Sequence, residues 1–455
     1  MDKPRQSWTT GLTGYHWFVF LVASAAWFFD CLDQRLFTLA RIPALTSLMP
    51  PDTPMGEIQA TGKEVTAVFL VGWGIGGLIF GAFGERYGRA RMLTVTVLIY
   101  SIFTGLTFFS RYYWDFAICR FLTGLGVGGV FGLAVSLIAE TLPDASRTGA
   151  LGMLQVLSTI GNIAAGLINS YLGSLQAREV IAPGEGWRYM FLVGAVPSLL
   201  VIATGTYLRE PERWLKAKAE GKLPTGNIFG PYQGLLADRR WRKNLIIGSL
   251  LASTGVVGLW AIGEYAPDLQ RKVFETHFTE TASSPLSPAE LKLKVTNAIS
   301  FAYILNMLGA GTGMWIFTKL AQWYGRKPAF AIGYISALVT TLLVYWKMNA
   351  PMEAYFMMPL MGAAQLSVFA GFAIYLPELF PSQYRSTGTS FCYNLGRFAA
   401  AAGSLFSAKL ATGVFGHFGS PLMERYSAMT MCAIFLVGLA TLPFAPETKD
   451  QPLPE

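Results

Sequence analysis

Long apolar runs alternate with short polar segments along almost the whole chain. Each run holds about 20 residues or more, which as an α-helix is long enough to cross the hydrocarbon core of a bilayer. Lipid offers backbone groups no hydrogen-bond partner, so the runs predict helices rather than strands. Twelve spans can be placed, at 16–40, 64–84, 91–110, 114–141, 148–173, 188–208, 244–266, 295–319, 328–348, 353–377, 385–411 and 426–445. The pattern predicts an all-α membrane protein with twelve transmembrane helices.

Two charged motifs occur twice at a nearly constant separation. The motif Glu-x-x-Pro-x-x-x-Arg begins at Glu140 and again at Glu378, 238 residues later. The segment Glu-Arg-Tyr-Gly-Arg at 85–89 returns as Gln-Trp-Tyr-Gly-Arg at 322–326, 237 residues later. An offset of about half the chain in an apolar sequence indicates two parallel copies of one six-helix unit, with a substrate site where the copies meet.

The repeat also predicts how the chain is divided. We expect one six-helix bundle over residues 1–208, a cytoplasmic linker with a short surface helix over 209–243, and a second bundle over 244–455. Two outer segments, 44–63 and 267–294, are long and more polar than the spans. We expect them to be solvated loops, and the alternative is that they cap the outer mouth.

Composition and charge agree with a membrane location. Hydrophobic residues make up 53% of the chain and charged residues 14%, against about 25% charged residues in a soluble domain. The net charge is +8, and most basic residues, including the run 239–243, fall on one side if both termini are cytoplasmic. We therefore expect a protein of the plasma membrane with both termini inside, whose positive charge contacts anionic lipid and not nucleic acid.

Nothing in the sequence predicts catalysis. The three histidines are scattered, there is no phosphate-binding loop, and no nucleophile has a base near it in sequence. The four cysteines all fall in spans and lack metal-ligand spacing. We expect no enzyme activity, no cofactor, no metal and a monomeric chain.

Several stretches together resemble the major facilitator superfamily of transporters. They are the loop Gly81–Arg91, the glycine-rich stretch Arg120–Gly129, and the two Glu-x-x-Pro-x-x-x-Arg motifs. Glu210–Trp214 and Pro446–Lys449 resemble the terminal signatures of the sugar porters and of the neighbouring aromatic-acid and sialic-acid/proton symporters. The resemblance implies alternating access, in which two halves rock around a central site.

The repeated loops predict a charged latch on the cytoplasmic face that holds the two halves together while the protein opens outward. Gly88 supplies the tight turn between helices 2 and 3, where a positive φ is tolerated. Gln322 replaces the acid of the first copy, so the second latch is expected to be weaker. The alternative is that these residues are only charged loop ends. The latch candidates are Glu85, Arg86, Gly88, Arg89, Glu140, Arg147, Arg326, Glu378 and Arg385.

Charges inside the spans point to ion coupling, because each costs several kcal/mol in the bilayer unless it is paired or hydrated. Asp33 lies 16 residues beyond Trp17, about 24 Å along helix 1. Arg120 lies 20 residues before Glu140 on helix 4, about 30 Å from the cytoplasmic end. These similar depths predict an ion pair whose carboxylate binds a proton when the arginine moves away. The alternative is a permanent structural pair.

The aspartate pair of helix 1 adds a resemblance to the aromatic-acid symporters, in which two aspartates have the same spacing. The resemblance implies that Asp33 carries the proton and that Asp30 is a second acid. Asp33, Asp30 and Arg120 are therefore the candidate proton-coupling residues.

Arg397 is the other charge expected deep in the membrane. It lies 12 residues after Arg385, about 18 Å up helix 11, and no acid of the second half has an obviously matching depth. Its planar guanidinium suits a carboxylate ligand. The alternative is an arginine satisfied by carbonyls, hydroxyls and amides. Further candidates for substrate contact are Gln155, Asn162, Gln365, Tyr393 and Asn394.

Helix 7 narrows the substrate class. Its stretch Gly248–Gly255 lacks the paired glutamines that sugar porters use to hold hydroxyl groups. The predicted function is therefore proton-coupled symport of a small organic anion, such as a monocarboxylate, an aromatic acid or a sugar acid. The alternative is a facilitative or proton-coupled transporter of a neutral sugar or polyol.

Overall fold

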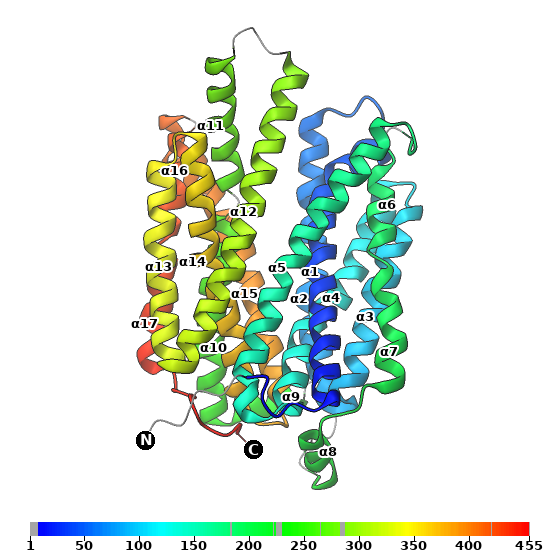
Figure 1. The fold of residues 1–455 in the computed structure, drawn as a ribbon, viewed down its shortest axis with the longest axis vertical. Helices are drawn as coiled ribbons and strands as arrows, with labels where there is room; N and C mark the ends of the chain where they lie inside the picture. The colour runs from blue at the N-terminus through cyan, green and yellow to red at the C-terminus, as the bar shows by residue number, and fades with distance from the viewer. Residues whose placement is uncertain are drawn as a thin grey trace. The chain divides into compact units, whose positions relative to one another are not determined.

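The computed structural model describes residues 8–182, 184–221, 223, 230–263, 265–282, 287–419 and 421–454. Within these residues the regular elements are all helices (Figure 1). Eleven of them are long and apolar enough to cross a membrane. The expected all-α membrane fold is confirmed.

The first half supplies the first six spans. Five are long helices, whereas the sixth is divided by a short 3₁₀ segment that contains Pro197. Two short helices, α8 and α9, follow. The elements are α1 (Gly14–Leu48), α2 (Met55–Tyr87), α3 (Arg89–Leu106), η1 (Thr107–Phe109), α4 (Tyr113–Thr141), α5 (Asp144–Ala177), α6 (Gly186–Val193), η2 (Val196–Leu199), α7 (Leu200–Tyr207), α8 (Glu212–Ala219) and α9 (Gly230–Ala237).

The second half supplies the remaining spans, and two of its helices end in a π-helical turn. Its elements are α10 (Arg239–Val257), η3 (Gly258–Ile262), α11 (Tyr265–Thr281), α12 (Pro288–Trp323), α13 (Arg326–Lys347), α14 (Pro351–Glu378), α15 (Arg385–Lys409), η4 (Leu410–Val414), η5 (Gly416–Phe418), α16 (Leu422–Met431), α17 (Ile434–Thr441) and η6 (Leu442–Phe444). α15 covers the eleventh predicted span but is not among the eleven apolar helices. It carries several buried polar side chains, among them Thr387, Asn394 and Arg397.

The two outer segments expected to be loops are mostly helical. α1 continues to Leu48 and α2 begins at Met55, while α11 runs to Thr281 and α12 begins at Pro288. The loop prediction was therefore wrong. At 35 residues α1 is about 50 Å long, so it exceeds the roughly 30 Å hydrocarbon core.

Buried apolar side chains continue along these extensions, which explains why they stay helical. Leu45 and Ile58 are buried on the first pair of helices, and Phe274 is buried on the second. Ser287 also forms a capping box with Glu290, which starts α12 early. In Figure 1, α11 and α12 extend beyond the neighbouring helices of their unit.

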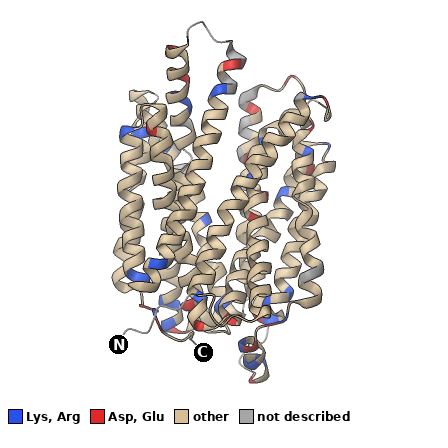
Figure 2. Ribbon diagram, in the orientation of Figure 1, with Lys and Arg blue, Asp and Glu red and all other residues tan. Residues whose placement is uncertain are grey.

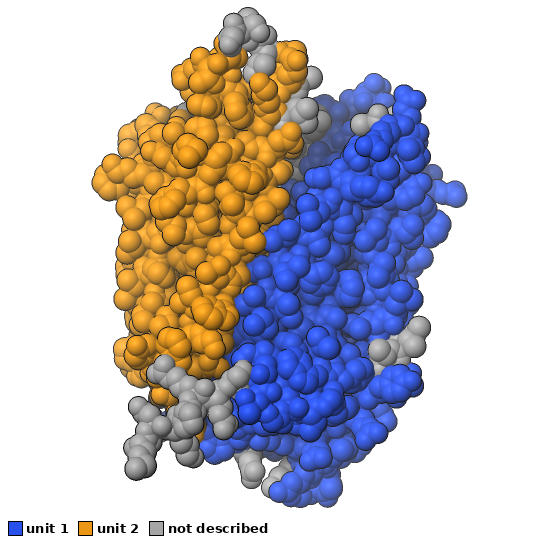
Figure 3. Space-filling view, viewed as in Figure 1, with its two compact units in different colours: residues 1–245, 373–394, 451–455 blue, residues 246–372, 395–450 orange. Residues whose placement is uncertain are grey.

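The chain forms two compact units, coloured separately in Figure 3. Unit 1 contains residues 1–245, 373–394 and 451–455, and unit 2 contains residues 246–372 and 395–450. The end of α14 and the first turns of α15 therefore pack with the first half of the chain. The division expected at residues 209–243 stays a prediction about the functional halves.

Unit 1 is built around α4, whose residues Gly126 to Glu140 are buried throughout. Glycines let the backbones of α4 and α2 touch, since a Cβ atom at Gly128 or Gly76 would overlap backbone atoms of the facing helix. This close packing holds α4 directly against α2. Arg120 and Glu140 lie on α4, 20 residues apart, which is about 30 Å along the helix axis.

In unit 2, glycines likewise let the backbones of α12 and α14 come into contact. Cβ atoms at Gly309 and Gly313 would overlap the backbone of Pro359 and Ala363. Figure 2 shows that charged residues in both units gather near the ends of the helices, with few in the middle. Those few are the candidates for transport chemistry.

Candidate functional site

Asp33 and Arg120 face each other in the interior of unit 1. Asp33 Oδ2 lies 3.6 Å from Arg120 Nη1, and both side chains are fully buried. Thr104 of α3 donates a hydrogen bond to Asp33 Oδ1 at 2.9 Å. Arg120 Nη2 donates to Thr107 Oγ1 at 2.7 Å. The structure thus brings together the pair expected from helix depth, and adds two threonines that the sequence did not single out.

Aromatic rings surround the Arg120 guanidinium. Its central carbon lies 4.5 Å from the ring centre of Phe191 and 5.8 Å from that of Phe37. A desolvated cation over such rings gains about 2 kcal/mol, which helps to hold the charge in place. Asp30 lies one turn before Asp33, is fully buried, and accepts a hydrogen bond from Gln34 at 3.0 Å.

Gln155 and Tyr393 belong to a second buried group in unit 1. Trp27 Nε1 donates to Gln155 Oε1 at 2.9 Å. The Trp27 ring lies 5.0 Å from that of Phe131, which stacks on Tyr393 at 3.9 Å. Within the described part of the chain, Gln155 Nε2 is buried and makes no hydrogen bond. An amide donor beside three aromatic rings could bind a planar polar ligand.

The amides of Asn162 and Asn394 bond to their own helices. Asn162 Nδ2 donates to the carbonyl of Ser158 at 3.1 Å, and Asn394 Nδ2 donates to that of Ser390 at 2.8 Å. Asn394 also packs against Gly77 of α2, where any Cβ would overlap it. Its surroundings are those of a packing contact between helices.

Gln365 and Arg397 lie in unit 2. Gln365 Nε2 donates to Thr341 Oγ1 at 2.9 Å, which joins α14 to α13. Arg397 projects from α15 and is only 5% exposed. Its burial agrees with the expectation, and its depth in the membrane stays a prediction.

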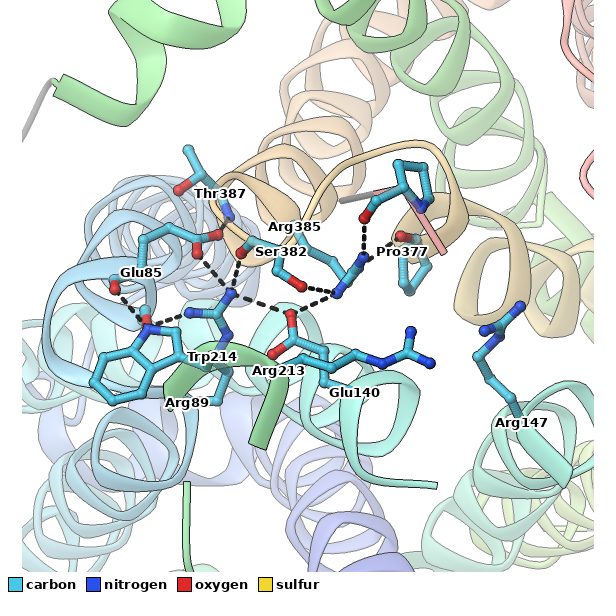
Figure 4. A network of polar contacts seen from close by, with 12 residues as sticks. Glu85, Arg89, Glu140, Arg147, Arg213, Trp214, Pro377, Ser382, Arg385 and Thr387 are labelled. Atoms are coloured by element: carbon cyan, nitrogen blue, oxygen red, sulfur yellow. Dashed lines mark hydrogen bonds and ion pairs between the residues drawn. The ribbon is translucent and has the colours of Figure 1, made fainter. Parts of the chain in front are cut away.

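Six of the predicted latch residues are buried and form ion pairs, and Figure 4 shows the pairs around Glu140. Glu140 Oε1 accepts from Arg385 Nη1 at 2.7 Å and from Arg89 Nη2 at 3.1 Å. Arg89 also pairs with Glu85 at 2.6 Å. Arg147 lies 3.5 Å from Glu378, and both are nearly fully buried. We refer to these six residues as the charge cluster: Glu85, Arg89, Glu140, Arg147, Glu378 and Arg385.

Residues that the sequence did not single out complete this cluster. Trp214 of α8 donates its indole N–H to the Glu85 carbonyl at 2.8 Å, and the Thr387 amide donates to Glu85 Oε1 at 3.1 Å. Ser382 accepts from Arg89 through its carbonyl and from Arg385 through its hydroxyl, the latter at 2.9 Å. These contacts surround the cluster with hydrogen bonds (Figure 4).

The segment after the last helix also reaches the cluster. The Gln451 carbonyl accepts from Arg147 at 3.4 Å, and the Pro454 carbonyl accepts from Arg385 at 3.1 Å. Leu453 between them is buried. Each of the two arginines thus donates both to a carboxylate and to this segment, and Arg385 donates to the Pro377 carbonyl as well.

The turn before α3 depends on Gly88, whose φ is +108°. Glu210 then caps α3, accepting from the amides of Ala90 at 3.1 Å and Arg91 at 3.0 Å. A carboxylate at a helix N-terminus satisfies unpaired amides and complements the helix dipole. Arg86 of the same turn is exposed and lies 5.4 Å from the ring centre of Tyr87.

Unit 2 repeats this arrangement. Gly325 has a φ of +104°, and Glu447 accepts from the amides of Arg326 at 2.9 Å and Lys327 at 3.0 Å. Arg326 donates to the carbonyl of Ala321 at 3.0 Å. Burial alone would raise the pKa of Glu447, but these backbone amides and that of Lys449 hold it below its ordinary value.

Comparison with known proteins agrees with this fold and these motifs. Residues 17–404 match the profile of the Major Facilitator Superfamily. The chain belongs to the major facilitator superfamily. It is therefore an integral membrane transporter and not an enzyme.

Individual relatives carry small solutes. The chain is 26% identical to the cis,cis-muconate transport protein of Acinetobacter baylyi, covering 80% of this chain and 81% of the relative. It is 25% identical to the sialic acid transporter NanX of Escherichia coli, covering 84% of each. Among solved structures, the proton:xylose symporter XylE bound to 6-bromo-6-deoxy-D-glucose superposes with a TM-score of 0.76 at 21% identity, covering 96% of this chain and 98% of that chain.

Proposed function

We propose that this protein is a proton-coupled symporter of a small organic anion, such as a monocarboxylate, an aromatic acid or a sugar acid. It works by alternating access in the plasma membrane, as a monomer with both termini in the cytoplasm. The observation that carries the proposal is the fully buried Asp33–Arg120 pair, whose charged atoms lie 3.6 Å apart.

Asp33 is the proton carrier. Its carboxylate takes up a proton when Arg120 moves away and releases it when the guanidinium returns, because the nearby positive charge favours the ionised acid. A contact ion pair with two close hydrogen bonds would resist protonation. The 3.6 Å separation is longer than a hydrogen bond, which leaves room for a proton on Oδ2. Asp30, one turn away, is the second acid.

Arg397 anchors the anion. Arg397 is buried, and the planar guanidinium of an arginine matches the geometry of a carboxylate. Muconate and sialic acid, which the names of two relatives mention, both carry carboxyl groups. Gln155 and Tyr393, in unit 1, offer an amide donor and an aromatic face, and they stay candidates for substrate contact.

The charge cluster acts as the cytoplasmic latch. It joins helices of the first half to the first turn of α15 through Glu140 and Arg385. Opening that end of the transporter separates these pairs, so the cluster stabilises the state in which the cytoplasmic end is closed. The paired helix caps at Glu210 and Glu447 keep the two copies of the turn in shape.

The test is uptake of radiolabelled cis,cis-muconate, benzoate and sialic acid into proteoliposomes that contain the purified full chain. An inward proton gradient should drive accumulation of at least one of them, and a protonophore should abolish it. Asp33→Asn should lose accumulation but retain exchange of internal for external solute. Arg397→Gln should raise KM at least tenfold. Lys409→Gln removes a positive charge from the exposed end of the same helix, α15, and is the control for loss of charge alone.

The opposite outcome is equally clear. If none of the acids is taken up, and xylose equilibrates without sensitivity to pH or to Arg397→Gln, the protein is a facilitator of neutral sugars. The Asp33–Arg120 pair would then be a permanent structural ion pair.

A further inference from the structure

The end of α3 places one threonine against the acid and another against the base of the buried pair. Thr104 and Thr107 are three residues apart, so they lie on the same face of the helix. Thr104 donates to Asp33 at 2.9 Å, whereas Thr107 accepts from Arg120 at 2.7 Å. Thr107 directs its own hydroxyl hydrogen to the carbonyl of Phe103 at 2.8 Å. One threonine is therefore a donor to the acid and the other an acceptor from the base.

These contacts hold the two charges apart. Between the acid and the base, the closest atoms are Asp33 Oδ2 and Arg120 Nη1 at 3.6 Å. Neither atom makes a hydrogen bond to any other group in the described residues. Two buried, opposite charges would close to about 2.8 Å if nothing else held them. The threonines take up the other oxygen and the other nitrogen, so the gap has a structural cause.

We propose that Thr104 and Thr107 are positioning residues that set the proton affinity of Asp33 in opposite directions. The inference rests on the proposed proton coupling and deepens it. Thr104 stabilises the ionised carboxylate by donating to it. Thr107 weakens the ion pair because it accepts a hydrogen bond from Arg120 Nη2, which is then not directed at Asp33.

The other groups around Asp33 come from four spans. Arg120 comes from α4, Tyr100 from α3, and Asp30 lies on the same helix as Asp33. The sixth span adds Phe191, whose ring lies against Arg120, and the backbone at Gly194, where a Cβ would come within 3.2 Å of Asp33 Oδ1. Arg120, Asp30 and Tyr100 are the ionisable groups in this set.

The two valine variants should therefore shift protonation in opposite senses. Thr104→Val removes a donor to the carboxylate, so Asp33 should hold its proton to higher pH, by about one pH unit. Thr107→Val removes the acceptor of Arg120 Nη2. The guanidinium should then move toward the Asp33 carboxylate, and the 3.6 Å distance between them should shorten. Asp33 should then lose its proton at lower pH, by a shift of about the same size. A variant that only loosened the helix would not produce shifts of opposite sign.

The measurement is an infrared pH titration of the purified full chain in lipid, which needs no solute. The difference between the wild-type and Asp33→Asn spectra isolates the carboxylic C=O band of Asp33, and its midpoint pH is compared among variants. Thr104→Ser and Thr107→Ser keep the hydroxyl and should restore the wild-type midpoint. Thr96→Val is the matched control, because Thr96 is also buried on α3 but bonds only to the carbonyl of Leu93.

The outcomes separate this inference from the proposed function. If no Asp33 band appears at any pH at which the protein stays folded, Asp33 carries no proton and the symport proposal fails as well. If the band titrates but both valine variants share the wild-type midpoint, or shift the same way as Thr96→Val, the threonines do not position the pair. The proposed proton-coupled symport would then remain, with no positioning role for Thr104 and Thr107.

Discussion

The two copies of the repeated Glu-x-x-Pro-x-x-x-Arg motif form crossed ion pairs of unequal strength. In one pair, Glu140 meets Arg385 at 2.7 Å, and both side chains are fully buried. In the other, Glu378 meets Arg147 at 3.5 Å. Each pair joins an acid from one copy to an arginine from the other, so the sequence symmetry is preserved in the contacts. Their geometry is not equal.

Neighbouring residues explain the difference. Glu140 accepts from Arg89 as well as Arg385, and Glu85 is a second buried carboxylate on Arg89. Arg147 instead directs Nη1 to Asp144 at 2.8 Å, and the Asp144 side chain is 49% exposed. The second pair can thus rearrange toward solvent, whereas the first cannot.

This asymmetry shows that two copies of one sequence motif can form ion pairs of unequal strength. Removing one partner of a buried pair leaves an uncompensated charge and costs about 3–5 kcal/mol, and the cost is smaller where the remaining charge keeps a second partner. The first pair should therefore decide whether the cluster stays closed. The second should adjust its stability.

The largest effect is expected from Glu140→Gln compared with Glu378→Gln. Glu140→Gln leaves buried Arg385 without the carboxylate it pairs with, while Arg89 keeps Glu85, so the closed cluster should lose about 3–5 kcal/mol. Glu378→Gln should cost less, because Arg147 keeps Asp144. The measurement is maleimide labelling of Ser386→Cys in a background without the native cysteines. Ser386 is buried in this region, so opening of the cluster exposes it.

Two further variants make this comparison decisive. Asp144→Asn should enhance the effect of Glu378→Gln, since Arg147 then loses both carboxylates, and it should leave Glu140→Gln unchanged. Equal labelling rates in Glu140→Gln and Glu378→Gln would show that the two ion pairs stabilise the closed cluster equally. The difference in their distances would then have no effect on opening.

The sequence predicted the membrane fold and the members of the cluster because both depend on strong, local signals. Apolar runs fix helices in lipid, and the offset of 237 or 238 residues pairs the charged motifs. The same offset relates Glu210 to Glu447, the two helix caps, and Arg188 to Arg425, which bond to carbonyls at the ends of the third and ninth spans. These pairs were present in the sequence and were not singled out.

Other features leave no such signal. Nothing distinguishes Thr104 and Thr107 from the many threonines that bond to their own helix, because their charged partners lie on other helices, α1 and α4. The outer extensions of α1 and α12 were missed because span prediction stops at the thickness of lipid. The difference between 2.7 and 3.5 Å in the two crossed pairs depends on side-chain packing, which a motif does not encode.

A smaller effect is expected from the two glycines that open the repeated turns. At Gly88 and Gly325 φ is +108° and +104°, so any alanine is strained by about 1–3 kcal/mol. The Cβ of Gly88→Ala would also overlap the Glu210 carboxylate, whereas that of Gly325→Ala would lie 2.7 Å from Glu447. Both should lower the midpoint of thermal unfolding, and Gly88→Ala should lower it more. Equal losses would show that backbone strain, and not the cap, sets the cost.

The smallest effect is a pH dependence at the Glu447 cap. Burial of this carboxyl would raise its pKa, but the amides of Arg326, Lys327 and Lys449 outweigh burial and hold the pKa below the ordinary value of 4.5. Because the folded pKa is lowered, the stabilisation is fully present above pH 4.5 and is lost as the pH falls through the folded value. Unfolding midpoints of the wild type and Glu447→Gln should therefore differ by a constant amount near neutral pH and converge in acid. A difference that persisted in acid would mean that the protonated carboxyl still caps the helix, and that charge contributes nothing to this turn.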